Sequence, residues 1–204
     1  LKTGKIKNNE TINITFIEGK NMRYIAKIIA QNTENTEEDV YTLLKDKEYI
    51  DSLIDNYWFI TEEINNSNIY YSLEGYLFPD TYQFESTKVD IKTIFKTMLD
   101  KMSTVLDSYK TNIDTSKYTV HQMLSLASMI ELEAKNAEDR AEVSGVFYNR
   151  LNKNMSLGSD VTTYYAVKKE MERWTSVPFE RFYSPMNKIV MVKMPDGYNG
   201  TYMK

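Results

Sequence analysis

The segment IYYSLEGYLFPDTY, from Ile69 to Tyr82, constrains the fold more than any other part of the chain. Gly75 and Pro79 interrupt it, so it cannot form an ordinary helix. The turn-prone run NNSN at residues 65–68 comes directly before it. We therefore predict a domain boundary after this run and a rigid, irregular aromatic loop beyond it.

The first 68 residues predict a small strand–helix–helix module. Apolar residues alternate with polar ones around Ile14, which predicts a short strand over residues 13–18. Asn21 is the expected N-cap of a first helix. Thr36 is the expected start of a second helix, because three acidic residues follow it at the positive end of the helix dipole.

The rest of the chain, residues 69–204, is mainly helical in its pattern. Apolar spacing predicts helices over residues 91–109, 120–135 and 138–151. The tail after Trp174 holds most of the prolines and predicts irregular structure with one strand. Together with the N-terminal strand, this pattern predicts an α+β fold.

Composition excludes several classes of site. The chain has 204 residues and a formal net charge of −4, without the clustered basic excess of a general nucleic-acid binder. It has no cysteine, so thiolate chemistry is excluded. Its single histidine is His121, which leaves too few histidines for a histidine zinc site and makes a Ser-His-Asp triad a weak candidate. If the protein is an enzyme, carboxylates must transfer the protons.

One glutamate has an unusual place on the helix expected over residues 120–135. A helical wheel at 100° per residue groups the apolar side chains into one stripe, and Glu131 falls inside it. Burial of a carboxylate raises its pKa, as a general acid at neutral pH requires. The stripe consists of Val120, Met123, Leu124, Ala127, Ile130 and Ala134.

An alternative role for Glu131 is structural. It can form an ion pair at the helix edge, for instance with Lys135 four residues later. The wheel places Glu133 well to the side of the stripe, which makes it the weaker catalytic candidate. The pattern alone leaves the catalytic and the structural roles of Glu131 open.

Two later motifs can each have either a structural or a substrate-binding role. Arg150, beside Asn149, closes the helix expected over residues 138–151, where it can satisfy terminal carbonyls or pair with an acid. It can equally orient a carboxylate or sugar substituent of a substrate. Asp160, in the run SDVT, suits a helix N-cap, but it can also face a polar substrate group or steer Glu131.

Two weaker indications concern sugar binding and the position of this chain within a longer protein. Tyrosine suits sugar-binding clefts, although its commoner role is a half-buried surface position. The chain begins at Leu1 with a polar segment, so we expect it to be a piece of a longer protein. No run of about 18 apolar residues occurs, so we expect this piece not to span a membrane.

Several stretches together resemble the YceG-like family of endolytic murein transglycosylases. Residues 73–82, LEGYLFPDTY, match that family's hallmark at every position. Residues 126–133, LASMIELE, resemble its LASIVEKE helix, and residues 146–151, VFYNRL, resemble its VFxNRL. Residues 157–162, LGSDVT, resemble LQSDPT, with Gly158 and Val161 as the departures.

The resemblance implies a domain organisation and a set of site residues. Residues 1–68 would be a LysM-like module and residues 69–204 the transglycosylase domain, tethered by a preceding transmembrane helix at the extracytoplasmic face of the cell membrane. Glu131, the first glutamate of the LASIVEKE-like helix, would be catalytic, and no metal or cofactor is needed. Other residues would bind substrate or support the site: Glu74, Tyr82, Asn149, Arg150, Asp160, Thr162, Ser184 and Asn187.

The resemblance also implies a reaction. The expected activity is endolytic cleavage of the β-1,4 bond between N-acetylmuramic acid and N-acetylglucosamine, leaving a 1,6-anhydromuramoyl end. Peptidoglycan strands would be the partner, with proteins of cell-wall synthesis or division as further candidates and no nucleic acid. Two other hypotheses remain: a peptidoglycan-binding or scaffold protein that has lost activity, and a true glycan hydrolase.

Overall fold

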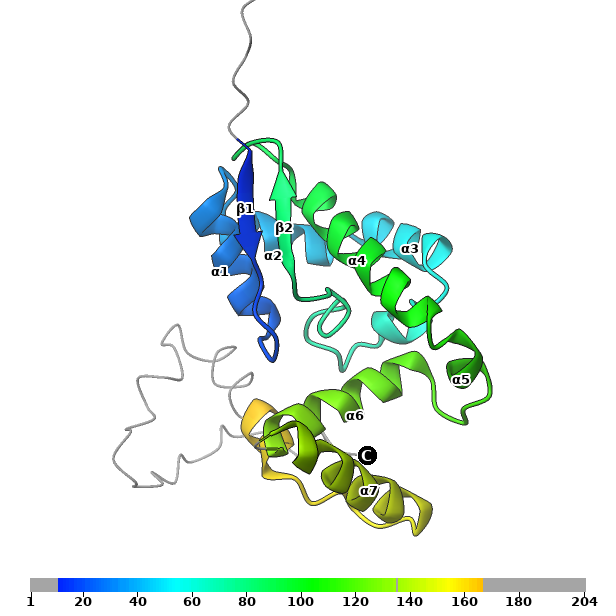
Figure 1. Cartoon of the computed structure of the whole chain (residues 1–204). Coiled ribbons are helices and arrows are strands. Elements are labelled where there is room, and N and C mark those ends of the chain that lie inside the picture. Colours follow the sequence, from blue (N-terminus) through cyan, green and yellow to red (C-terminus); the bar gives the residue numbers. More distant parts are fainter. Residues whose placement is uncertain (1–10, 135, 167–204) are drawn as a thin grey trace, which may run out of the picture. The chain divides into compact units, whose positions relative to one another are not determined.

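The computed structural model describes residues 11–134 and 136–166 (Figure 1). The chain divides into two compact units, Leu1–Ser128 and Met129–Lys204. The described part is mainly helical with one small sheet, which confirms the predicted α+β class. The elements are β1 (Ile12–Thr15), α1 (Met22–Asn32), α2 (Glu37–Lys45), α3 (Lys47–Asn56), the 3-10 helix η1 (Glu62–Asn65), β2 (Thr81–Phe84), α4 (Ile91–Asp107), α5 (Lys110–Asp114), α6 (Val120–Glu133) and α7 (Ala137–Asn152).

The sheet of the first unit joins two distant parts of the chain. β1 and β2 pair antiparallel, with Ile14 opposite Tyr82 (Figure 1). Residues on one face of each strand enter the core, so Ile14 is 1% exposed and Tyr82 is 7% exposed. β1 also packs against α1, and α2 packs against α1, α3 and α4.

This pairing bears on the domain boundary predicted after residue 68. β1 precedes that position and β2 follows it, yet the two strands form one sheet. The core of the first unit likewise takes side chains from α1, α2, α3 and α4. The observed division after Ser128 therefore differs from the expected one, and residues 1–68 do not form a compact unit of their own.

The helix starts of the first unit follow the predicted caps. The Asn21 side chain accepts a hydrogen bond from the Tyr24 N–H at 3.1 Å. Thr36 and Asp39 form a capping box at the start of α2, with each side chain bonded to the other's backbone N–H. Both predicted N-terminal signals are confirmed.

The capping box makes a specific stability prediction. Thr36→Ala should destabilise the protein by about 1 kcal/mol in urea unfolding at neutral pH, because one helix N–H loses its side-chain acceptor. The hydrogen bonds from Thr36 hold the pKa of Asp39 below 3.8. Their contribution is therefore present above pH 3.8 and is lost as the pH falls below it, so the cost of Thr36→Ala should shrink there. Thr42→Ala, at an exposed position of the same helix, is the control and should be near neutral.

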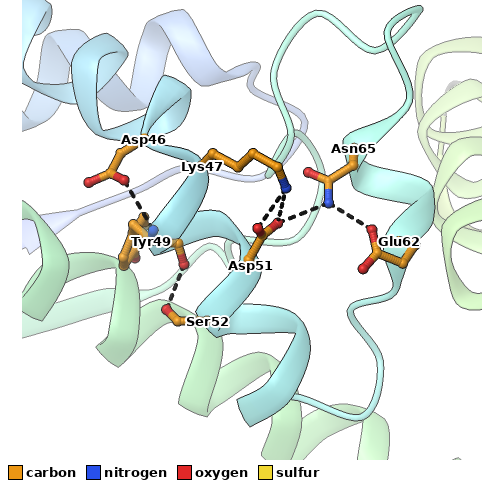
Figure 2. A network of polar contacts seen from close by, with 7 residues as sticks. All are labelled: Asp46, Lys47, Tyr49, Asp51, Ser52, Glu62 and Asn65. Carbon is orange, nitrogen blue, oxygen red and sulfur yellow. Dashed lines mark hydrogen bonds and ion pairs between the residues drawn. The ribbon is translucent and has the colours of Figure 1, made fainter.

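A polar network on the surface joins α3 to η1 (Figure 2). Lys47 forms an ion pair with Asp51 at 2.6 Å, one helical turn later. The Asn65 side-chain amide donates to Asp51 at 3.2 Å and to Glu62 at 2.8 Å. The Lys47 ammonium holds the pKa of Asp51 below its ordinary value. The network holds the end of η1, a few residues before the irregular loop of residues 69–80.

The hallmark loop, residues 69–80, is irregular as predicted and is packed into the core of the first unit. Gly75 lies in the left-handed region with φ of 84°, which favours glycine. Leu73 and Tyr76 are 0% and 1% exposed. The Tyr76 hydroxyl lies 3.0 Å from Nδ1 of His121, in the first turn of α6, and burial raises the pKa of Tyr76. The chain's one histidine therefore links this loop to α6.

Candidate functional site

The site predicted on α6 lies at the end of that helix. Two members of the predicted apolar stripe, Val120 and Leu124, pack against the core of the first unit. Ala127, however, is exposed, and Leu126 is the buried residue of α6. The wheel was wrong here because it assumed a single buried face, whereas α6 carries apolar side chains on more than one side. Glu131 and Glu133 lie in its last turn.

Glu131 is half-buried and ion-paired. Its side chain is 36% exposed, and one Arg140 nitrogen lies 3.1 Å from Oε1 and 3.0 Å from Oε2. Arg140 sits in the first turn of α7, which the Asn136 side chain caps by accepting from two helix N–H groups. The alternative of an edge ion pair thus has Arg140 as the partner, and Lys135 lies outside the described residues.

The arginine offsets an unfavourable place for a carboxylate. The C-terminal end of a helix carries partial negative charge, which repels an acidic side chain in the last turn. The Arg140 guanidinium supplies the opposite charge and is itself 51% exposed, so a ligand can reach it. Because Glu131 pairs with an exposed arginine rather than a buried one, another anion or hydroxyl can compete for it.

Glu133 has a different partner. Its Oε1 accepts a hydrogen bond of 2.6 Å from the Ser159 hydroxyl. Ser159 is 5% exposed, the buried polar residue of the described chain, and it directly precedes helical residues 160–166. Thr162 donates to the Ser159 carbonyl at 2.8 Å. Glu133 therefore anchors the start of this helix to the end of α6, and the Thr162 bond is local to the first turn of that helix.

Arg150 anchors the same loop from α7. Its Nη1 donates to the Leu157 carbonyl, so it satisfies a carbonyl, though one outside its own helix. Gly158, next in sequence, has φ of 62°. A Cβ there would lie 2.6 Å from Arg150 Nη1. The family's glutamine is replaced by glycine at a position where this chain's backbone favours glycine.

Gly158→Ala should loosen this loop. The left-handed backbone costs an L-residue about 1–2 kcal/mol, and the new methyl group would displace Arg150 from the Leu157 carbonyl. We expect faster amide hydrogen exchange in residues 155–166. Gly145→Ala is the matched control, since an added Cβ on that helical glycine meets nothing within 4 Å and alanine favours helix. Equal exchange in the two variants would contradict the assigned role of Gly158.

The remaining predicted site residues fall into three groups. Asn149 and Asp160 are exposed in the second unit. Glu74 and Tyr82 belong to the first unit, where the Glu74 carboxylate accepts from the Met22 N–H at 2.7 Å and the Tyr82 hydroxyl donates to the Phe78 carbonyl at 2.7 Å. Both bonds hold the fold of that unit, and a role for these two residues in substrate binding stays a prediction. Ser184 and Asn187 lie outside the described residues.

Sequence reasoning missed Arg140 altogether. It lies nine residues from Glu131 and on the next helix, so the i,i+4 rule for one helix cannot find it. The only available signal was an arginine in the first turn of the following helix, where a cation is unusual. Among the described helices, none is both long and apolar enough to cross a membrane.

Known proteins resemble this chain along most of its length. Residues 1–202 match the model of the YceG-like family. An endolytic murein transglycosylase of Bacillus subtilis is 37% identical over 161 residues, which are 78% of this chain and 45% of that protein. One from Streptococcus pneumoniae serotype 2 is 33% identical over 163 residues, covering 76% of this chain and 29% of that protein.

A solved structure resembles the fold as well. The 2.6 Å crystal structure of a putative YceG-like protein from Listeria monocytogenes matches with a TM-score of 0.71 and 34% identity. The match covers 76% of this chain and 51% of that one. The chain therefore spans less than half the length of the curated relatives that it matches.

Proposed function

Because the chain belongs to the YceG-like family, we propose that it is the catalytic part of an endolytic peptidoglycan lytic transglycosylase, with Glu131 as its acid/base residue. The substrate would be the β-1,4 bond between N-acetylmuramic acid and N-acetylglucosamine within glycan strands. Relatives that share 33–37% identity and are named endolytic murein transglycosylases support this substrate class.

The observation that carries the residue assignment is the different pairing of the two glutamates. Glu133 is engaged by the buried Ser159, so its carboxylate is committed to the loop. Glu131 is held only by the exposed Arg140 and keeps about a third of its side chain accessible. Glu133 is itself exposed, so the assignment of Glu131 rests on the two partners: Arg140 is exposed, whereas Ser159 is buried.

In the proposed reaction Glu131 acts twice. As an acid, it protonates the glycosidic oxygen while the bond to the muramoyl carbon breaks. As a base, it then takes the proton of the muramoyl 6-hydroxyl, which closes on the same carbon and forms the 1,6-anhydro ring. The first step leaves the carboxylate ionised, and Arg140 is the cation that lies beside it.

The other predicted residues have supporting roles in this proposal. Asn149 and Asp160 are exposed and can contact sugar substituents. Arg150 bonds to the Leu157 carbonyl and Thr162 to the Ser159 carbonyl, so both hold the segment that leads into the helix beginning at Asp160. The protein would act at the extracytoplasmic face of the membrane, held by a segment that precedes this chain, and it would meet proteins of cell-wall synthesis or division there.

Digestion of purified sacculi separates this proposal from its two rivals. The full chain is incubated with sacculi, and the released muropeptides are identified by mass spectrometry. Fragments with 1,6-anhydromuramoyl ends are the expected result. Fragments with reducing muramoyl ends would favour the hydrolase alternative. Binding to sacculi without any released fragment would favour the scaffold alternative.

A further inference from the structure

A tyrosine-lined pocket of about 300 Å³ lies in the first unit, and none of its lining residues is on α6. Such a volume is at the lower end of the range for small-ligand pockets, roughly 300–1,000 Å³, and matches a ligand the size of one sugar residue. α2 provides one wall and the start of the hallmark loop the other. The lining residues are Glu38, Tyr41, Leu44, Lys45, Tyr70 and Tyr71.

The three tyrosine rings form a connected aromatic wall. Tyr41 and Tyr71 are stacked, with ring centroids 5.7 Å apart and an interplanar angle of 18°. Tyr70 meets Tyr71 edge-on, with centroids 4.8 Å apart and an angle of 82°. Tyr41 and Tyr71 also pack against the core, which holds the wall in place. Tyr70 remains 43% exposed, which core packing does not require.

Charged groups border this aromatic wall. Glu38, Tyr41 and Lys45 are spaced three and four residues apart, so α2 presents them on one face. Glu38 and Lys45 are exposed, and supply a hydrogen-bond acceptor and a donor at the pocket. An aromatic face with a few polar groups around it complements a pyranose, whose ring face is apolar and whose rim carries hydroxyl and acetamido groups.

We propose that this pocket is a glycan subsite that binds one N-acetylhexosamine residue of a peptidoglycan strand, with Tyr70 as its principal contact. The proposal rests on the proposed function for the choice of ligand, but it concerns binding outside α6 and not the cleavage step. Its occupant would hold a strand to the protein, so that the same strand could be cut more than once before release. It places glycan recognition on both sides of residue 68, since α2 precedes that residue and Tyr70 and Tyr71 follow it.

This placement decides how the subsite must be tested. Deleting residues 1–68 would remove β1, the partner strand of β2, along with much of the core. A loss of glycan binding in such a deletion would therefore report unfolding. Point substitutions of exposed pocket residues in the full chain avoid this, and Tyr70 is the most accessible of the three rings.

The test measures binding of N-acetylglucosamine pentamer by calorimetry in a Glu131→Gln background, so that the proposed catalytic carboxylate plays no part in the measurement. Tyr70→Ala should raise the Kd by about tenfold. Tyr70→Phe keeps the ring and should retain most of the affinity. Lys45→Ala provides a second pocket variant on α2. Tyr109→Ala is the matched control, because Tyr109 is 59% exposed in the same unit and lies outside the pocket.

The outcomes are distinct. If Tyr70→Ala and Lys45→Ala both bind the pentamer as tightly as Tyr109→Ala does, or if the parent does not bind it, the subsite proposal is overturned. Sacculus digestion with Glu131 restored then tells the two proposals apart. Cleavage by the parent together with unchanged binding in the pocket variants would refute the subsite alone. Tyr70-dependent binding without any cleavage would refute the proposed activity and retain the subsite.

Discussion

Replacing Glu131 with glutamine is expected to lower the rate of glycan cleavage by ~10²–10⁴-fold, the usual contribution of general acid–base catalysis. Glutamine has nearly the same size as glutamate, and its amide oxygen can still accept a hydrogen bond from Arg140. It cannot donate or take the catalytic proton. The loss should therefore appear in kcat for muropeptide release, while circular dichroism and the melting temperature stay close to those of the parent.

The neighbouring glutamate supplies the control for this experiment. Glu133→Gln keeps an acceptor for the Ser159 hydroxyl, so the loop should stay anchored and the activity should fall only slightly. Glu131→Gln with about a tenth or more of the parent's activity would reject the catalytic assignment. A larger loss in Glu133→Gln than in Glu131→Gln would exchange the roles of the two carboxylates.

Local signals predicted the bounds of α4, α6 and α7 and the starts of α1 and α2, but they did not predict α3 or α5. The observed α4, α6 and α7 begin and end within two residues of the ranges expected from apolar spacing. The caps at Asn21 and Thr36 were correct as well. All of these depend on residues within one or two turns of each other, where periodicity and capping chemistry decide the conformation.

Local signals did not predict contacts between residues that are distant in the sequence. β2 has only four residues and follows Pro79 closely, so its alternation at Tyr82 and Phe84 was too short to predict a strand. Its pairing with β1 closes a loop of about 65 residues, which no local pattern encodes. The pairing crosses the boundary expected after residue 68, and local signals could not predict that.

The candidate site was predicted in part. The wheel and the family motif both selected Glu131, but they gave neither its half-exposed state nor its pairing with Arg140. Arg140 lies on the next helix, α7, which begins at Ala137. The same limit applies to Glu133, whose partner Ser159 lies 26 residues away. The sequence showed which residues carry chemistry, but it did not show which side chains on other helices and loops they would pair with.

The cleavage products should carry 1,6-anhydromuramoyl ends, so digestion in ¹⁸O-labelled water should leave the new muramoyl terminus unlabelled. Glycoside hydrolases ordinarily place two carboxylates on either side of the bond, one as acid and the other as base or nucleophile. The nearest carboxylate to Glu131 on α6 is that of Glu133, and it accepts a hydrogen bond from Ser159. Asp160 is exposed at the start of a helix, a place that suits hydrogen bonding.

With Glu131 as the single acid/base carboxylate of the proposal, the substrate's own 6-hydroxyl is a better nucleophile than water. It is attached to the sugar whose bond breaks, so it reacts at a high effective molarity, up to roughly 10⁵–10⁸ M for well-oriented groups, which water at the same carbon cannot match. Mass spectrometry of the released fragments reads the result directly. Unlabelled anhydro ends are expected from the parent. Substantial label at the muramoyl terminus would mean that water attacks, and Asp160→Asn would then be the variant to test for the missing second carboxylate.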